Sequence, residues 1–272
     1  MRRTRLWLGA GIVGTALVVA VLAPELSPFD PARQDLLARL RPPAWAERGS
    51  LVHPLGTDGY GRDLLSRLMH GARISLLVGG MAMALSCVIG TLLGMVAGWR
   101  QGVVGAVVMR LADAQMALPE ILLAIIVVAT LGGGLVNLVV VLGASTWMVY
   151  ARMAYGLTRS TAALPFVEAA RAQGARENHI LRRHILPQLM PVLLVVSTLQ
   201  VAQLILAEAA LSFLGLGIPP PTPSWGNILA EGRDRLFLAP WIADSAGLAL
   251  LVTVLGVNLL GEGLRAWLDP RK

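Results

Sequence analysis

The sequence predicts an all-α membrane protein with six transmembrane helices. Hydrophobic residues make up 56% of the 272 residues and charged residues 14%, whereas a typical soluble domain has about 25% charged residues. The apolar residues form long blocks, each long enough to cross a bilayer. Six crossings also place the arginine-rich segments on one side, as expected of cytoplasmic loops.

The first block follows the basic start MRRTR and runs without charge to the end of segment 1–23. A signal peptide begins in the same way, but its apolar region has only about 7–15 residues. We therefore expect an uncleaved first helix with a cytoplasmic N-terminus. Segment 24–72 is rich in proline and carries both charge signs, which predicts an extracytoplasmic segment. Within it, residues 63–72 have apolar side chains at helical spacing and are expected to lie along the outer membrane surface.

The predicted permeation core spans residues 73–264, and its first helix is expected at about 74–99. Gly90, Gly94 and Gly98 recur at every fourth position of that helix. They share one face, where a neighbouring helix can approach closely. This spacing predicts a helix-packing surface.

The third span is expected at about 103–131 and is unusual in carrying polar residues. Arg110 and Asp113 are three positions apart, so they are predicted to pair on one helix. Pro119 predicts a kink.

The fourth, fifth and sixth spans are expected at about 135–153, 191–216 and 241–264. The most basic loop, 159–190, lies between the fourth and fifth and is predicted to be cytoplasmic. The tail, 265–272, is basic again. With six spans, both termini are therefore expected in the cytoplasm.

The basic loop has the local pattern of two short helices. Pro165 suits a first helical turn, and Glu168 then lies near the positive helix end. Two alanines follow, which would let a partner surface approach, and Gly174 is a natural stop. A second helix is expected at about 177–184, ending before Pro187. An amphipathic connector lying on lipid headgroups is the alternative interpretation.

Polar residues follow one arc of the fifth span, opposite Leu, Ile and Val. An ionisable residue within a span suggests function, although Glu208 could also cap or pair near the outer interface. The candidates for lining a translocation path are Ser197, Gln200, Gln203 and Glu208.

No catalytic motif is present: the sequence has neither a phosphate-binding G-x-x-x-x-G-K-[ST] loop nor H-E-x-x-H. The lone Cys87 excludes an internal disulfide. Basic residues are not interleaved with aromatic ones, so nucleic acid is not an expected partner. Four residues could in principle form a metal site, but they are better interpreted as turn and helix-cap residues, and we predict no metal ligands among them. These residues are His53, Asp58, Asp63 and His70.

The run EAARAQGA at 168–175, followed by Ile-Leu-Pro at 185–187, resembles the E-A-A-x-x-x-G-x(9)-I-x-L-P signature of ATP-binding-cassette (ABC) importer permeases. The Ile does not fall at the strict spacing of that signature, and Ile185-Leu186-Pro187 is the closer match. Segments 53–79, 208–229 and 258–271 resemble the corresponding segments of dipeptide, oligopeptide and nickel permeases, in the second of the two permease subunit types. The resemblance covers nearly the whole chain. The sequence departs from the usual pattern in two places: Gln188 follows the Pro where the family often has Asn, and Asn178-His179 stands where the family often has an Arg before the Ile.

This resemblance implies a type I ABC importer permease fold in the bacterial inner membrane. It implies transport of di- or oligopeptides by alternating access, with no cofactor bound by this chain and ATP-Mg on partner ATPases. The implied partners are a homologous permease, two cytoplasmic ATPase subunits, an extracytoplasmic solute-binding protein and membrane lipid. The residues implied in the ATPase-coupling loop are Glu168, Ala169, Ala170, Gly174, Ile185 and Pro187.

Three alternatives remain at this point. A nickel or other small-solute importer belongs to the same family. An ion-coupled secondary transporter would need paired intramembrane charges and inverted repeats, and neither is clear in the sequence. A membrane enzyme would need His, Asp or Glu clustered at one depth, which the sequence does not provide.

Overall fold

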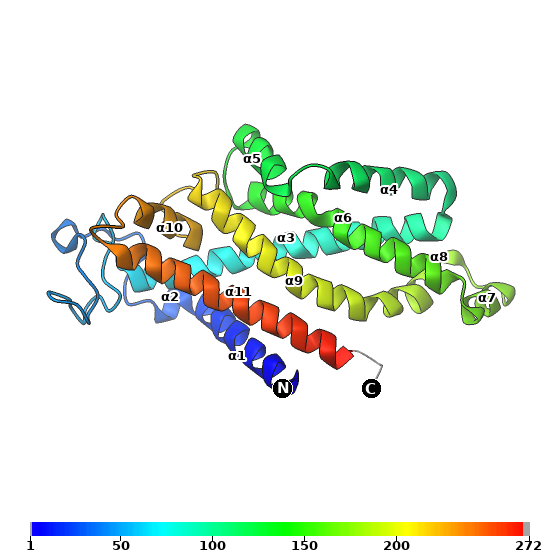
Figure 1. Ribbon diagram of the computed structural model, residues 1–272, viewed down its shortest axis with the longest axis horizontal. Coiled ribbons are helices and arrows are strands. Elements are labelled where there is room, and N and C mark those ends of the chain that lie inside the picture. The colour runs from blue at the N-terminus through cyan, green and yellow to red at the C-terminus, as the bar shows by residue number, and fades with distance from the viewer. Residues whose placement is uncertain (1, 269–272) are drawn as a thin grey trace.

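The computed structural model describes residues 2–268, and its regular elements are helices that run mostly along one long axis (Figure 1). Within these residues, five helical segments are long and apolar enough to cross a membrane, or six if one bent pair is counted as a single span. The five are α1 (Arg2–Val21), α3 (Leu64–Arg100), α6 (Leu135–Ala162), the run Glu177–Phe213 and α11 (Pro240–Leu268).

The bent pair is α4 (Gly102–Met116) and α5 (Glu120–Leu131), whose axes differ by 88°. The kink predicted at Pro119 is therefore a complete break. Pro119 has extended backbone angles, and proline disfavours helix in the residue before it. Neither half is long enough to cross a bilayer alone.

The predicted pairing of Arg110 with Asp113 is wrong. Asp113 instead forms an ion pair with Arg152 of α6, the helix against which α4 packs. Helical spacing permits a pair within one helix, but the packing of two helices placed another arginine closer.

The separate surface helix expected at 63–72 is also wrong. Asp63 caps α3 by accepting a hydrogen bond from the Ser66 backbone N–H at 2.8 Å, so the helix begins at Leu64 and continues without interruption to Arg100. Leu64 and Arg67 are buried because the preceding segment and α10 (Trp225–Arg233) cover them. The first turns of α3 therefore belong to the core of the protein.

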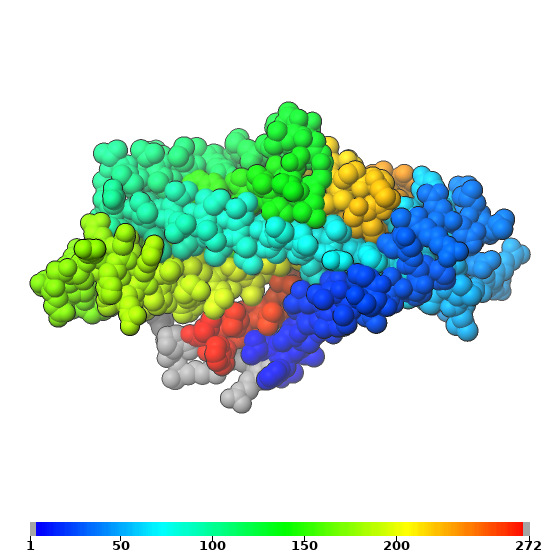
Figure 2. Space-filling view, turned by 180° about the vertical axis from the view of Figure 1, so that it is seen from behind, coloured from blue at the N-terminus to red at the C-terminus, as the bar shows by residue number. Residues whose placement is uncertain are grey.

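The two ends of the bundle differ (Figures 1 and 2). One end carries the arginine-rich segment with α7 (Pro165–Ala172) and α8 (Glu177–Ile180), which we call the basic end. The opposite end carries α2 (Ala23–Leu26), the short helix η1 (Leu36–Ala38) and α10. In Figure 2, yellow-green residues of the basic end and light-blue residues of the opposite end project beyond the bundle on the two sides.

Helices α1 and α11 run side by side in opposite directions, so the start of one lies beside the end of the other (Figure 1). Arg5 and Glu262 form an exposed ion pair there, at 2.8 Å. The part of the predicted tail beyond Leu268 lies outside the described residues.

Close packing of α3 on α6 forms the centre of the bundle. A Cβ atom added at Gly90 would lie 2.2 Å from the Trp147 carbonyl oxygen, and one at Gly94 would lie 2.2 Å from that of Ala151. At Gly98 the nearest atom, the Tyr155 carbonyl oxygen, would be 2.7 Å away. The regular glycine spacing thus lies along the contact between the two helices.

This packing predicts that Gly94→Ala destabilises the protein by about 1–3 kcal/mol, because the added methyl group has no space beside the α6 backbone. Gly80→Ala is the matched control, since nothing lies within 4 Å of its Cβ position on the same helix. Thermal unfolding of the purified protein in detergent measures both. Equal unfolding midpoints for the two variants would contradict the packing argument.

Candidate functional site

Helix α7 presents a small-residue surface at the basic end. Val167 is buried and attaches the helix to a cluster that includes Tyr150 and Ile180. Glu168 and Ala169 on the outer side are exposed, and the next residue is half-buried. The carboxylate is in the first helical turn, where the helix dipole favours a negative charge. The outer side of α7 therefore offers one acidic group and accessible backbone to a partner.

The turn after α7 is a Schellman motif centred on Gly174. The Gly174 N–H donates to the Arg171 carbonyl oxygen at 2.9 Å, and the Ala175 N–H donates to that of Ala170 at 3.1 Å. These are the two bonds that end a helix through a left-handed residue, and Gly174 has φ +80°. The predicted end of the helix at Gly174 is therefore formed by backbone hydrogen bonds and a left-handed residue. A Cβ atom added at this position would have no neighbouring atom within 4 Å.

The second half of the loop differs from the prediction. Helix α8 continues through a π-helical turn, η2 (Leu181–Ile185), directly into α9 (Leu186–Phe213). Pro187 therefore lies within this continuous helical run, directly after the π-helical turn, and does not end a separate helix.

Ile185 and Pro187 have different surroundings although they are close in sequence. Ile185 is fully buried in the cluster that also holds Ile180 and Leu189, whereas Pro187 is exposed. Within this chain, Ile185 anchors the loop to the bundle. The other residues predicted to contact the ATPase lie on α7, at the end of α7 and at Pro187.

The polar residues of α9 do not share one environment. Gln203 is exposed, Gln200 is buried, and Ser197 accepts a hydrogen bond from the Tyr150 hydroxyl at 3.2 Å. Glu208 is fully buried: its two carboxylate oxygens accept from Ser75 on α3 and from Ser212, each at 2.7 Å. The carboxylate therefore joins α9 to α3 and presents no free surface within this chain.

Replacing Glu208 by alanine is expected to lower the free energy of unfolding by about 1–3 kcal/mol, because two buried hydroxyls lose their acceptor. Glu208→Gln keeps an acceptor oxygen and should lose less. Chemical or thermal unfolding in detergent tests the order. If the glutamine variant is as unstable as the alanine variant, the hydrogen bond between Glu208 and Ser75 does not stabilise the contact between α9 and α3.

At the opposite end, two arginines lie between two carboxylates. Arg67 Nη1 is 2.5 Å from Asp58 Oδ2 and 2.6 Å from Glu231 Oε2, and Arg62 contacts the same two carboxylates. Asp58 is fully buried and Arg67 is 1% exposed. This network joins the segment before α3 to α10. Sequence reasoning missed it because Arg62 and Glu231 are 169 positions apart, and no local pattern marks such a pair.

The four residues considered for a metal site have different contacts. Asp63 caps α3 and its other oxygen lies 2.9 Å from His53 Nδ1, while Asp58 belongs to the arginine network. His70 Nε2 lies 3.4 Å from the Ser27 hydroxyl. Across residues 2–268, no group of three or more His, Cys, Asp and Glu side chains is arranged to hold a metal ion.

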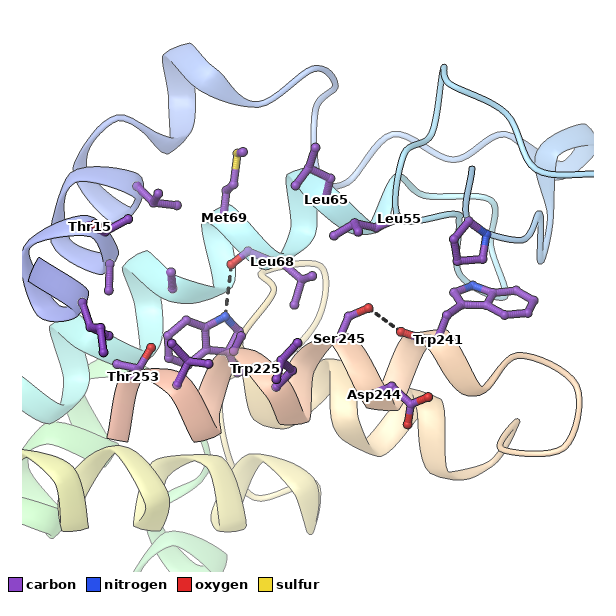
Figure 3. A pocket seen from close by; sticks show the side chains of 18 of the residues that line it. Thr15, Leu55, Leu65, Leu68, Met69, Trp225, Trp241, Asp244, Ser245 and Thr253 are labelled. Carbon is purple, nitrogen blue, oxygen red and sulfur yellow. Dashed lines mark hydrogen bonds between the residues drawn. The ribbon is translucent and has the colours of Figure 1, made fainter. Parts of the chain in front are cut away.

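A large apolar cavity of about 1040 Å³ opens between α1, α11 and the start of α3 (Figure 3). Trp225 points into it and donates its indole N–H to the Leu68 carbonyl oxygen at 3.1 Å. Asp244 is the one charged residue in its lining.

Comparison with known proteins gives consistent results. Residues 90–272 match the family model described as binding-protein-dependent transport system inner membrane component. The chain is 43% identical to the di/tripeptide transport system permease protein DppC of Pseudomonas aeruginosa, over 96% of this chain and 87% of that protein. It is 40% identical to the glutathione transport system permease protein GsiD of Pectobacterium atrosepticum, over 99% and 88% respectively.

Among solved structures, the chain is similar to an inward-facing conformation of the MetNI methionine ABC transporter. The TM-score is 0.60 with 19% sequence identity, and the match covers 76% of this chain and 98% of the other. At this identity, the likeness concerns the fold alone.

Proposed function

Because the chain belongs to the family of binding-protein-dependent transport system inner membrane components, we propose that it carries small peptides as one permease subunit of an ATP-driven importer. Membership confirms the family resemblance seen in the sequence. The protein is a multi-pass inner membrane transport subunit. The relatives named for di/tripeptides and glutathione support a peptide substrate.

The exposed outer side of α7 is the observation that carries the coupling part of the proposal. This surface would dock on one of the two cytoplasmic ATPase subunits, which would bind ATP-Mg. Its residues are Glu168, Ala169, Ala170 and Gly174. The Schellman turn supports this role, because it holds the end of α7 in one conformation. Ile185 would transmit the movement from the loop to α9 through its buried contacts.

The same proposal sets the orientation and the other partners. The basic end would be cytoplasmic, since basic residues are enriched on that side of inner membrane proteins. A homologous permease would complete the path across the membrane, and a solute-binding protein would deliver peptide at the opposite end. Gln203 would face the path because it is the exposed one of the four polar candidates on α9, and Ser197 and Gln200 would lie near the path with less exposed side chains. Glu208 would hold the path-forming helices together.

The test is uptake of a labelled dipeptide into proteoliposomes that contain the partner permease, the ATPase pair and the binding protein. Glu168→Arg should abolish ATP-dependent uptake while the complex still inserts. Glu25→Arg, an exposed charge reversal at the opposite end, is the control. Uptake that persists without the ATPases would overturn the assignment as an ATP-driven importer. Uptake of nickel in place of any peptide would overturn the proposed peptide substrate.

A further inference from the structure

A polar cleft of about 780 Å³ lies beside α7 at the basic end. One wall is the turn between α3 and α4, residues 99–104, and the other is the end of α7 with the segment that follows it, including Arg171 and Glu177. Buried Ile180 is also part of the lining. Figure 2 shows the two walls next to each other at the end of the molecule. The cleft is therefore continuous with the surface assigned above to ATPase docking.

The charge of the cleft favours an acidic occupant. Arg100 and Arg171 are exposed, and neither forms an ion pair with a carboxylate in the described part of the chain. The Arg171 guanidinium carbon lies 4.3 Å from the centre of the Trp99 ring. Stacking of this kind holds the planar group in place while its N–H donors stay available at the edge. With Glu177, the lining carries two positive charges and one negative charge.

The position of the cleft favours a soluble protein over a lipid headgroup. The elements that line the cleft, which include the end of α7 and the turn between α3 and α4, lie farther along the long axis than the ends of α1 and α11 at this side (Figure 1). A soluble partner that already contacts α7 can reach this position with an acidic segment.

We propose that an acidic segment of the partner ATPase enters this cleft and pairs with Arg100 and Arg171, so that the ATPase holds two elements of the permease. The inference rests on the proposed function, because the occupant is the same ATPase. Gln101 alone separates α3 from α4. A partner seated against this turn would therefore move α3 and α4 together with α7, α8 and α9.

The experiment measures binding of the purified ATPase pair to the permease pair in lipid nanodiscs, with and without anionic lipid. The double variant Arg100→Glu/Arg171→Glu should weaken binding by about tenfold or more in both lipid mixtures, since attraction becomes repulsion. The matched double variant with lysine should retain most of the affinity. Arg159→Glu, an exposed charge reversal outside the cleft lining, should stay within about twofold of wild type.

The outcomes separate this inference from the proposed function. If the glutamate double variant binds as wild type while Glu168→Arg does not bind, the cleft proposal is overturned and the coupling role of α7 stands. If the double variant is weakened only in anionic nanodiscs, the cleft holds lipid headgroups and the proposal is overturned. If Glu168→Arg also binds normally, the ATPase-docking assignment itself fails.

Discussion

Replacing Gly174 by valine is expected to reduce ATP-driven peptide uptake by about tenfold or more. The Gly174 backbone has φ +80°, a conformation that a β-branched residue adopts only with strain of about 1–3 kcal/mol. Such a cost would displace the end of α7 by breaking the two bonds of the Schellman motif. About 1.4 kcal/mol corresponds to a factor of ten in an equilibrium. The native conformation of the proposed coupling surface would therefore become a minor population.

Gly174→Asn is the matched control for this experiment. Asparagine tolerates the left-handed conformation, and no atom lies within 4 Å of the Cβ position, so its side chain has space. Uptake should remain near the wild-type level, while both variants insert equally into the membrane. If valine and asparagine lower uptake to the same extent, backbone geometry at Gly174 does not explain its role.

Replacing Asp58 by alanine is expected to destabilise the protein by about 3–5 kcal/mol. The change leaves Arg62 and Arg67 facing the single carboxylate of Glu231, and an uncompensated buried charge is costly. The Asp58 and Arg67 side chains are 0% and 2% exposed, so water can do little to screen the excess charge. The unfolding midpoint in detergent should fall clearly, and α10 should become more accessible to protease.

Asp234→Ala provides the comparison for the buried network. Asp234 forms an exposed pair with Arg233 at 3.1 Å, and the two side chains are 64% and 52% exposed. Exposed pairs contribute about 0–1 kcal/mol, so this variant should unfold close to the wild type. A similar loss in both aspartate variants would show that burial of the network is unimportant.

Local patterns predicted several features correctly, because they arise between neighbouring residues. Apolar block length and the distribution of arginines predicted a helical membrane protein with six spans. The described residues have five candidate spans, or six if the bent pair is counted as one, and the permease fold and family are confirmed. Pro165 and Gly174 predicted where α7 begins and ends, because proline and glycine act on their own backbone. The roles of the coupling and path residues remain proposals.

Predictions that depended on distant neighbours were less successful. The pattern at residues 63–72 indicated an amphipathic surface helix, but that pattern cannot distinguish a lipid surface from a cover formed by α10. A helical wheel of α9 placed Gln203 and Glu208 on one polar arc. In the structure Gln203 is exposed, whereas Glu208 is buried against Ser75. A helical wheel gives angular position but not the identity of the neighbouring helix.

The sequence by itself determined the class of the protein, the membrane-crossing blocks and the short helix proposed to meet the ATPase, since length, charge and turn chemistry act locally. Only the tertiary structure decided which charges pair and which helices touch. The partners of Asp113, Arg67 and Glu208 lie on elements far away in the chain. Their contacts arise from packing, which brings together residues with no relation in sequence.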